Sequence, residues 1–314
     1  MTSQADSSAR DDSPVKSMPD LKFRVLILGR ANAGKTTILE RIAGAAVSEA
    51  EVWRGGERSP ASMIKGQSDR GFHNVEDELR FPSRPGFVFH DSRGIESGSA
   101  EELETLRKFV EIRSSTNSIH EQLHAIWMCV PLDESRELFQ GERAPLSWSK
   151  EVAPLVVIFT KHDGAVLKET SKIMEQMTKD SSVTTISRSA KNRVRGEAHR
   201  LVTHRINELK GELSDFSPHK DTLGFLTAGG MQECTDETEK TCQELIELTE
   251  GQLNGPTMKT LLSVVWGRNL STQGFWAIYW TLLENHLKGK LGSGAPNTDE
   301  MLKRIVAIFV SGDN

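Results

Sequence analysis

The stretch Gly29-Arg30-Ala31-Asn32-Ala33-Gly34-Lys35-Thr36-Thr37 (GRANAGKTT) fits the pattern G-x-x-x-x-G-K-[ST] in full. An apolar run at 23–28 precedes it and a helical pattern at 38–43 follows it, so it has the strand–loop–helix context that the pattern requires. In this context the backbone N–H groups of the loop lie near a helix N-terminus, where they bind phosphate oxygens. The sequence therefore predicts a phosphate-binding loop directly after the first strand.

Different residues of this loop are suited to different parts of a nucleoside triphosphate. Gly29 and Gly34 allow backbone geometry that a Cβ atom would obstruct. Lys35 supplies a cation for the β- and γ-phosphates, and the hydroxyl of Thr36 is a ligand for Mg²⁺. The predicted nucleotide contacts of the loop are Gly29, Ala31, Asn32, Ala33, Gly34, Lys35, Thr36 and Thr37.

A second motif lies at 86–94, where an apolar strand ends in Asp91-Ser92-Arg93-Gly94, the pattern D-x-x-G. An aspartate at the tip of a strand beside the phosphate loop can bind Mg²⁺ directly or through water. Gly94 can turn its N–H toward a γ-phosphate because glycine has a wide φ/ψ range. We therefore predict a catalytic set of Lys35, Thr36, Asp91 and Gly94, with Thr36 and Asp91 as the metal ligands.

A third motif follows the most continuous apolar strand of the chain, 155–159. It reads Thr160-Lys161-His162-Asp163, which matches [NT]-K-x-D. A carboxylate accepts two hydrogen bonds from guanine, at N1–H and the 2-amino group, whereas adenine would leave it unpaired. We therefore predict that Asp163 selects guanine and that the Lys161 stem covers the base plane. Thr160 is a shorter tether than asparagine, so we expect it to hold the loops less firmly.

With the three motifs in this order, residues 21 to about 250 resemble the G domain of a P-loop GTPase of the translation-factor-like class. The phrases FPSRPGFVFHDSRG (81–94) and LHAIWMCVPLD (123–133) are similar to fungal G-domain-containing proteins, which are related in type to dynamin, septin and immunity-associated GTPases. The resemblance implies GTP/GDP exchange, Mg²⁺ and a nucleotide-driven switch. It implies phosphate and metal roles for Lys35, Thr36 and Asp91, and base recognition by Lys161 and Asp163.

One position departs from the family pattern. Ras-like members carry a glutamine after the D-x-x-G glycine, and it orients the attacking water, whereas this chain has Ile95. We therefore expect slow intrinsic hydrolysis, with Arg30 or Arg93 as candidate donors of positive charge and an arginine without a role as an equally good interpretation. The alternative is a GTP-binding scaffold or switch with negligible hydrolysis, read out by partner binding or self-association. An ATPase or nucleotide kinase is disfavoured by the TKHD motif.

The second loop on the base side has two candidates. Ser189-Ala190-Lys191 matches a triplet of Ras-like proteins, but the residues before it are polar for a strand inside a parallel sheet. Residues 223–230 are more apolar and end in glycines before a helical pattern at 236–250. We favour 223–230, which places Ala228 at the base and makes 165–213 a helical insertion.

These patterns together predict a doubly wound α/β fold with a mostly parallel sheet, the P-loop G domain, at 21–252. A disordered tail is expected at 1–20 and a C-terminal helical extension at 253–314. Residues 48–71 are interpreted as a long irregular switch loop, in which Ser59, Ser62 and Ser68 are equal candidates to reach the metal. Residues 73–81 are expected to be extended at a sheet edge.

Composition limits the other possibilities. A net charge of −5 gives no overall basic surface for nucleic acid, and the three cysteines fit neither a disulfide framework nor a zinc pattern. We find neither a signal peptide nor an apolar span and expect a cytoplasmic protein. The basic residues between 188 and 205 suggest an anionic partner, but Glu197 and Glu208 interrupt them and favour a solvated helix face. The sequence leaves a protein partner or homodimer open without indicating either, and it disfavours membrane-surface association.

Overall fold

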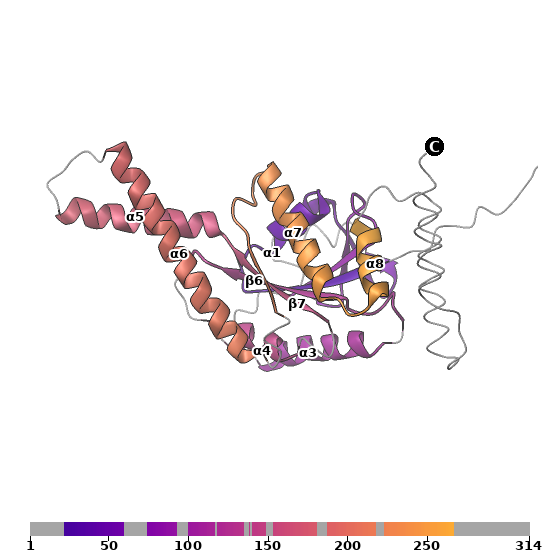
Figure 1. The fold of residues 1–314 in the computed structure, drawn as a ribbon. Helices are drawn as coiled ribbons and strands as arrows, with labels where there is room; N and C mark the ends of the chain where they lie inside the picture. Colours follow the sequence, from indigo (N-terminus) through magenta and orange to yellow (C-terminus); the bar gives the residue numbers. More distant parts are fainter. Residues whose placement is uncertain are drawn as a thin grey trace, which may run out of the picture. The chain divides into compact units, whose positions relative to one another are not determined.

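Eight strands form a single sheet in the order β3-β2-β4-β5-β1-β6-β7-β8 (Figure 1). This arrangement is seen in a computed structural model that describes residues 22–59, 74–92, 100–116, 118–134, 138, 140–148, 153–180, 187–217 and 223–266. The strands are β1 (Phe23–Leu28), β2 (Glu51–Arg54), β3 (Glu57–Arg58), β4 (Glu78–Arg80), β5 (Phe87–Asp91), β6 (Ala125–Pro131), β7 (Leu155–Thr160) and β8 (Gly224–Thr227).

Five neighbouring strands, β5-β1-β6-β7-β8, run parallel, whereas β4 is antiparallel to both β5 and β2, and β2 is antiparallel to β3. The predicted α/β class and mostly parallel sheet are confirmed. All side chains of β1, β6 and β7 are buried, which agrees with their continuous apolar runs and with a sheet covered on both faces. Trp127 and Cys129 of β6 belong to this core.

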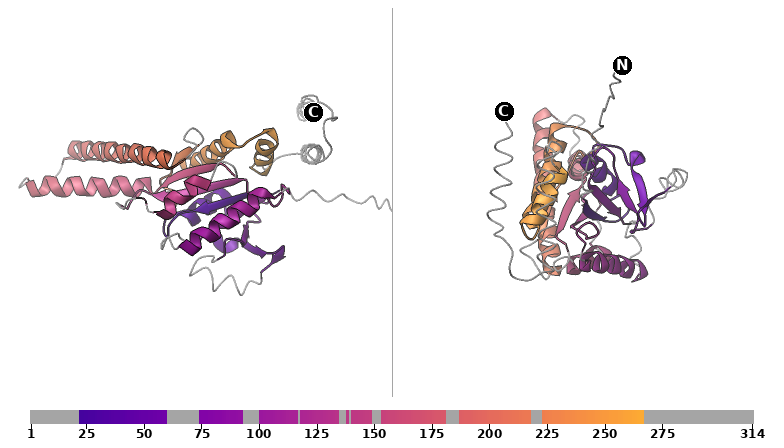
Figure 2. Two further views of the ribbon diagram at one scale, coloured as in Figure 1. Left: turned by 90° about the horizontal axis from the view of Figure 1, so that it is seen from below. Right: turned by 90° about the vertical axis from the view of Figure 1, so that its right-hand side faces the viewer.

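The helices of the described residues are α1 (Lys35–Ala43), the 3₁₀ turn η1 (Val47–Glu49), α3 (Ala100–Ser115), α4 (Gln140–Trp148), α5 (His162–Asp180), α6 (Arg188–Phe216), α7 (Asp236–Gln252) and α8 (Pro256–Trp266). Helix α7 contacts both α1 and α8, while α4 contacts both α3 and α6. These two groups of helices cover different faces of the sheet (Figures 1 and 2). Helix α4 was not predicted.

Two expectations for the first half of the chain are wrong. Part of the expected irregular loop 48–71 is a hairpin, because β2 and β3 pair through Gly55 and Gly56, which have φ of 59° and 88°. A Gly-Gly pair with positive φ values is a favoured hairpin turn. The strand expected at the sheet edge, β4, instead lies between β2 and β5, because the hairpin extends the sheet beyond it. Residues 60–73 lie outside the described part, as do the candidates Ser62 and Ser68.

The insertion between β7 and β8 is a pair of helices, α5 and α6, packed along each other. Figures 1 and 2 show this α5–α6 hairpin extending beyond the sheet. Residues 189–191 lie in the first turn of α6 and do not follow a strand, whereas β8 pairs in parallel with β7. The choice of 223–230 for the last strand and its loop is therefore confirmed.

One compact unit spans Leu21–Asn269, so α8 is part of the same unit as the sheet. The predicted tail, 1–20, and the predicted extension after Trp266 lie outside the described residues. Within the part of the chain that the structure describes, no helix combines the length and apolar content needed to cross a membrane.

Candidate nucleotide-binding site

The loop between β1 and α1 turns sharply at its two glycines. Gly29 has φ of 142°, and a Cβ atom there would lie 2.6 Å from the carbonyl oxygen of Cys129 on the neighbouring strand. Gly34 has φ of 84° and is the N-cap of α1. The contact with β6 at Gly29 leaves no room for a side chain, and the left-handed backbone at Gly34 would strain one. Both glycines are therefore required, as the sequence predicted.

Lys35 is the first residue of α1, and its side chain folds back over the loop. Its Nζ donates to the carbonyl oxygens of Gly29 at 2.8 Å and Arg30 at 3.0 Å. The first turn of α1 contains no acidic residue, so the positive end of the helix dipole is not neutralised by a side chain of its own helix. Thr36 is exposed in the same turn. The loop thus presents a cation, a hydroxyl and a helix N-terminus, a combination that suits an anion.

Asp91 ends β5, beside β1, and lies in the register position opposite Ile27. The residue as a whole is half-buried, but its Oδ1 atom is enclosed and has no hydrogen-bond partner among the described residues. Burial raises the pKa of Asp91 to about 6, and the positive charge of Lys35 opposes this rise. A buried carboxylate oxygen normally has a hydrogen-bond partner. The enclosed oxygen of Asp91 therefore suggests that this carboxylate binds a group from outside the protein.

The donors present fit Mg²⁺. The described residues contain no group of three or more His, Cys, Asp or Glu side chains placed to hold a metal. Mg²⁺ does not need such a group, because it commonly uses one or two protein oxygens together with phosphate oxygens and water. Asp91 and Thr36 are the two residues of this loop region that would hold it. Gly94, Arg93 and Ile95 lie outside the described residues.

The end of β7 is hydrogen-bonded directly to the loop between β1 and α1. The Oγ1 atom of Thr160 donates to the carbonyl oxygen of Ala33 at 2.7 Å, and both residues are buried. The Cβ position of Gly34 lies 3.4 Å from the Cβ of Thr160, an ordinary van der Waals contact. Although threonine is shorter than asparagine, it spans the gap between the two loops. The first and third sequence motifs are therefore adjacent at one end of the sheet.

An ion pair and a hydrogen bond also fix the positions of the residues that follow Thr160. Lys161 has φ of 57°, and its Nζ lies 3.0 Å from Oδ2 of Asp133. Asp163, in the first turn of α5, accepts a hydrogen bond on Oδ1 from the N–H of Gly230 at 2.9 Å. The loop after β8 therefore lies beside the carboxylate predicted to recognise the base.

Ala228 itself is fully engaged by its neighbours. Its N–H donates to the carbonyl oxygen of Phe159 at 2.7 Å, and its carbonyl oxygen accepts from the N–H of His162 at 3.2 Å. The N–H of Ala228 is thus used in the hydrogen bond with β7, and its carbonyl oxygen is used at the start of α5. The next residue, Gly229, lies against Asp163, since its Cβ position is 3.2 Å from the Asp163 backbone nitrogen. The closeness of Gly229 to Asp163 was not predicted, because it depends on the register between β7 and β8.

Arg30, a candidate donor of charge to the phosphates, is neutralised within the protein. It is 6% exposed and lies 3.1 Å from carboxylate oxygens of both Glu134 and Glu142. The contact with Glu134 has hydrogen-bond geometry, whereas the one with Glu142 is an ion pair without it. Arg30 therefore ties the loop to Glu134 and to Glu142 of α4, and its positive charge is paired within the protein.

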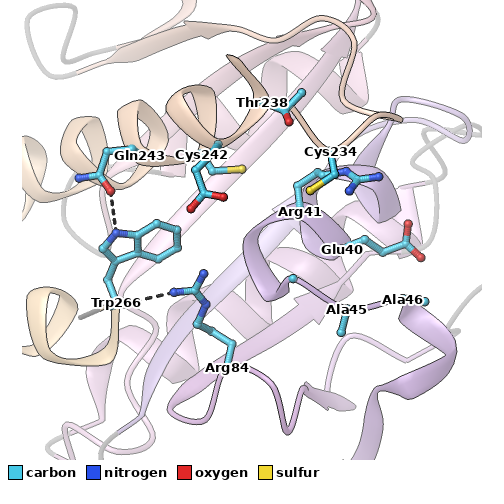
Figure 3. A pocket seen from close by; sticks show the side chains of 12 residues that line it. Glu40, Arg41, Ala45, Ala46, Arg84, Cys234, Thr238, Cys242, Gln243 and Trp266 are labelled. Carbon is cyan, nitrogen blue, oxygen red and sulfur yellow. Dashed lines mark hydrogen bonds between the residues drawn. The ribbon is translucent and has the colours of Figure 1, made fainter. Parts of the chain in front are cut away.

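A separate pocket of about 610 Å³ lies at the opposite end of α1 from the phosphate loop (Figure 3). On one side of it Arg84 stacks on the ring of Trp266, with 4.1 Å between its Cζ and the ring centroid. On the other side Arg41 of α1 donates to the carbonyl oxygens of Met231 and Gln232, each at 2.6 Å. Arg41 thus joins the helix after the phosphate loop to the loop after β8. No sequence motif marks it, because its partners are backbone atoms of a distant loop.

Neither a protein-family model nor a curated protein sequence matches this chain. Its function is therefore inferred from its own residues and their geometry.

Proposed function

We propose that this chain is a Mg²⁺-dependent GTP-binding protein that hydrolyses GTP slowly to GDP and phosphate and acts as a nucleotide-controlled switch. The observation that carries the proposal is the contact between its first and third motifs. The hydrogen bond from Thr160 to Ala33 makes the loops after β1 and β7 neighbours. A loop with the phosphate-binding pattern and a candidate base-binding carboxylate therefore lie at the carboxyl ends of nearby parallel strands, the edge at which open α/β sheets bind nucleotides.

Guanine is the base that this site suits. Asp163 presents a carboxylate whose Oδ1 is oriented by the Gly230 N–H. Guanine offers two donors to such a group, and adenine offers none at the same edge, so adenine would leave a charged acceptor desolvated and unpaired. The Lys161 stem would cover the base plane, and Gly229 would present its backbone beside Asp163.

The phosphates would bind at the loop around Lys35. Its ammonium group would exchange the carbonyl oxygens of Gly29 and Arg30 for phosphate oxygens, while the helix N-terminus adds backbone donors. Thr36 and Asp91 would hold Mg²⁺, which supplies charge neutralisation on the phosphate oxygens when it is bound. Because Asp91 Oδ1 is enclosed and has no described partner, the metal would also satisfy an acceptor that the protein leaves unpaired.

Slow turnover is supported by the state of Arg30, whose charge is already paired with Glu134 and Glu142. The proposed phosphate loop, 29–37, contains no other arginine. At the position where Ras-like GTPases carry the glutamine that orients the attacking water, this chain has Ile95. The same observation supports the second candidate, a GTP-binding scaffold or switch with negligible hydrolysis. Phosphate release measured in a single turnover separates the two, since the scaffold would release none over many hours.

The base assignment is tested by exchanging one hydrogen-bonding group. The purified chain should bind GTP and GDP in preference to ATP, and Asp163→Asn should lose guanine and gain xanthosine nucleotides. An amide N–H can donate to the 2-carbonyl of xanthine, where the carboxylate cannot. Asp236→Asn, at the exposed start of α7, is the matched control and should keep the original preference. Equal affinity of the unmodified chain for ATP and GTP would refute the proposal.

A further inference from the structure

The outer end of the α5–α6 hairpin carries a group of exposed cations. We call this group the basic tip and define it as Lys179, Arg188, Lys191, Arg193 and Arg195. Lys179 lies in the last turn of α5, and the other four lie in the first eight residues of α6. Figures 1 and 2 show that this end of the hairpin points away from the sheet.

The acidic side chains that the structure describes leave the charges of the basic tip unpaired. None of its five side chains forms an ion pair with a residue that the structure describes. The acids that interrupt the basic run in the sequence are used elsewhere on α6. Glu197 binds Arg200 through two hydrogen bonds, and Glu208 lies 3.5 Å from His204. Since the whole chain has a net charge of −5, the basic tip is a local departure from an acidic protein.

Helix stability gives no reason for this arrangement. Helix α6 begins after Ser187, whose side chain accepts a hydrogen bond from the Ala190 N–H, and its first turn contains no acidic residue. The N-terminus of a helix carries partial positive charge, so cations in the first turns are unfavourable there. Arg188 and Lys191 occupy positions at which an acid would stabilise the helix.

The cations surround the end of the hairpin and do not form a single stripe. With about 100° per residue, Arg188, Lys191 and Arg195 fall within about 60° of one another around the α6 axis. Arg193 lies about 170° from the centre of that group. Lys179 comes from the other helix, and near it Met177 is 41% exposed. A partner with a groove would contact one side of such a tip, whereas a flat anionic surface that meets it end-on attracts the cations on every side of it.

We propose that the basic tip docks the protein onto membrane surfaces that contain anionic lipids. Clusters of four to eight Lys and Arg residues bind such surfaces through the negative potential of the headgroups. The acidic remainder of the chain is repelled by the same potential, so the hairpin is oriented with its tip toward the lipid. Docking of this kind requires no membrane-spanning helix and does not depend on the nucleotide proposed above.

The test is sedimentation of the full chain with vesicles of phosphatidylcholine, with and without phosphatidylserine. Binding is expected only with phosphatidylserine, and it weakens as salt shortens the screening length. The variant Arg188→Gln/Lys191→Gln/Arg193→Gln/Arg195→Gln should lower the vesicle partition coefficient by about a thousandfold, since each cation near the surface contributes about a factor of five. Its thermal midpoint should stay equal or rise, because the removed charges oppose the helix dipole.

A matched variant makes the same change in net charge elsewhere: Arg58→Gln/Arg107→Gln/Lys108→Gln/Lys240→Gln. These four side chains are exposed and each pairs with a nearby glutamate, so their loss should leave vesicle binding unchanged. Equal loss of binding by both variants would mean that total charge is responsible and would overturn the proposal. It is also overturned if the unmodified chain does not sediment with phosphatidylserine vesicles, or if it captures RNA or an acidic protein through the tip while leaving vesicles unbound.

Discussion

The hydroxyl of Thr160 donates a 2.7 Å hydrogen bond to the carbonyl oxygen of Ala33, a residue 127 positions earlier in the chain. Thr160 ends a buried parallel strand, and Ala33 lies in the glycine-bounded loop that follows another. The bond is enclosed, so neither group can exchange its partner for water. It fixes the spacing between the parts of the site proposed to hold the two ends of one nucleotide.

Removing this hydroxyl without changing the size of the side chain should weaken both folding and nucleotide binding. Thr160→Val leaves the Ala33 carbonyl buried and unpaired, which costs about 1–3 kcal/mol of unfolding free energy. Nucleotide affinity should fall together with stability, because the two loops lose their common anchor. Denaturant titration and equilibrium GDP binding measure the two effects. Thr160→Ser keeps the hydroxyl and should retain most of the affinity, and a loss as large as that of the valine variant would argue against the role of this bond.

Arg41 should control how long a nucleotide stays bound. Its guanidinium holds the carbonyl oxygens of Met231 and Gln232, and these residues follow the loop that lies against Asp163. Arg41→Met removes two charge-assisted hydrogen bonds and should accelerate GDP dissociation by about tenfold, a factor that corresponds to about 1.4 kcal/mol. Stopped-flow release of a fluorescent GDP analogue measures this rate.

The control for Arg41 is another helical arginine that holds a backbone carbonyl. Arg113 of α3 donates to Glu121 and lies on a different part of the protein. Arg113→Met should leave the GDP dissociation rate unchanged. If both variants release GDP at the rate of the unmodified chain, Arg41 has no part in retaining the nucleotide.

Asp91 should destabilise the nucleotide-free protein at neutral pH. Because burial raises its pKa to about 6, its neutral form favours folding, and this contribution is lost as the pH rises through about 6. Asp91→Asn should therefore raise the free energy of unfolding by about 1–3 kcal/mol near pH 7.5, and the gain should disappear in acid. The same variant should lose Mg²⁺-dependent nucleotide binding. Denaturant titrations without metal or nucleotide, repeated across pH, measure the effect.

A second buried aspartate provides the contrast. Asp77 accepts hydrogen bonds from Arg54 at 2.6 and 2.7 Å, so its carboxylate is satisfied by the protein itself. Asp77→Asn should lower stability at neutral pH, the opposite of the result expected for Asp91. Lower stability in both variants would indicate that Asp91 also has a partner within the chain.

Two buried histidines should make the protein sensitive to acid. Arg24 donates its backbone N–H to Nδ1 of His124 at 2.8 Å, and its Nη1 lies 3.2 Å from Nε2 of His90. Burial, with the positive charge of Arg24 adding to it, lowers the pKa of His90 to about 4 and of His124 to about 3. The unfolded chain binds protons below about pH 6.5 that the folded protein excludes, so stability falls as the pH drops from about 6.5 toward 4.

This acid sensitivity is measured by denaturant titration across that range, with His124→Asn as the diagnostic variant. Asparagine can still accept from the Arg24 N–H but cannot be protonated, so the variant's stability should depend less steeply on pH. Its stability at neutral pH should be lower, because the imidazole stacks on Phe23 with 5.0 Å between the ring centroids. If the variant loses as much stability between about pH 6.5 and about pH 4 as the unmodified chain, the acid sensitivity comes from other groups.

The sequence was sufficient for features that depend on neighbours in the chain. The glycine-bounded loop after β1, the buried strands and the helical insertion follow from local patterns of glycine, apolar residues and helical spacing. The choice between 189–191 and 223–230 for the base-side loop also followed from strand composition. The Gly55-Gly56 hairpin carried a local signal too, but the charged residues around it concealed that signal.

Features that depend on distant contacts could not be predicted in this way. The pairing of Arg30 with Glu134 and Glu142, and of Arg41 with the loop after β8, joins residues more than 100 positions apart. The engagement of the Ala228 backbone depends on the register between β7 and β8, which the sequence of either strand leaves undetermined.

Short strands form both margins of the described sheet. At one margin β3 has two residues, both charged and exposed, and at the other β8 has four. Short edge strands and charged edge residues disfavour pairing with a strand from another molecule. If copies of this chain assemble, they are therefore expected to join through helices and loops, so that a dimer would form without lengthening the sheet.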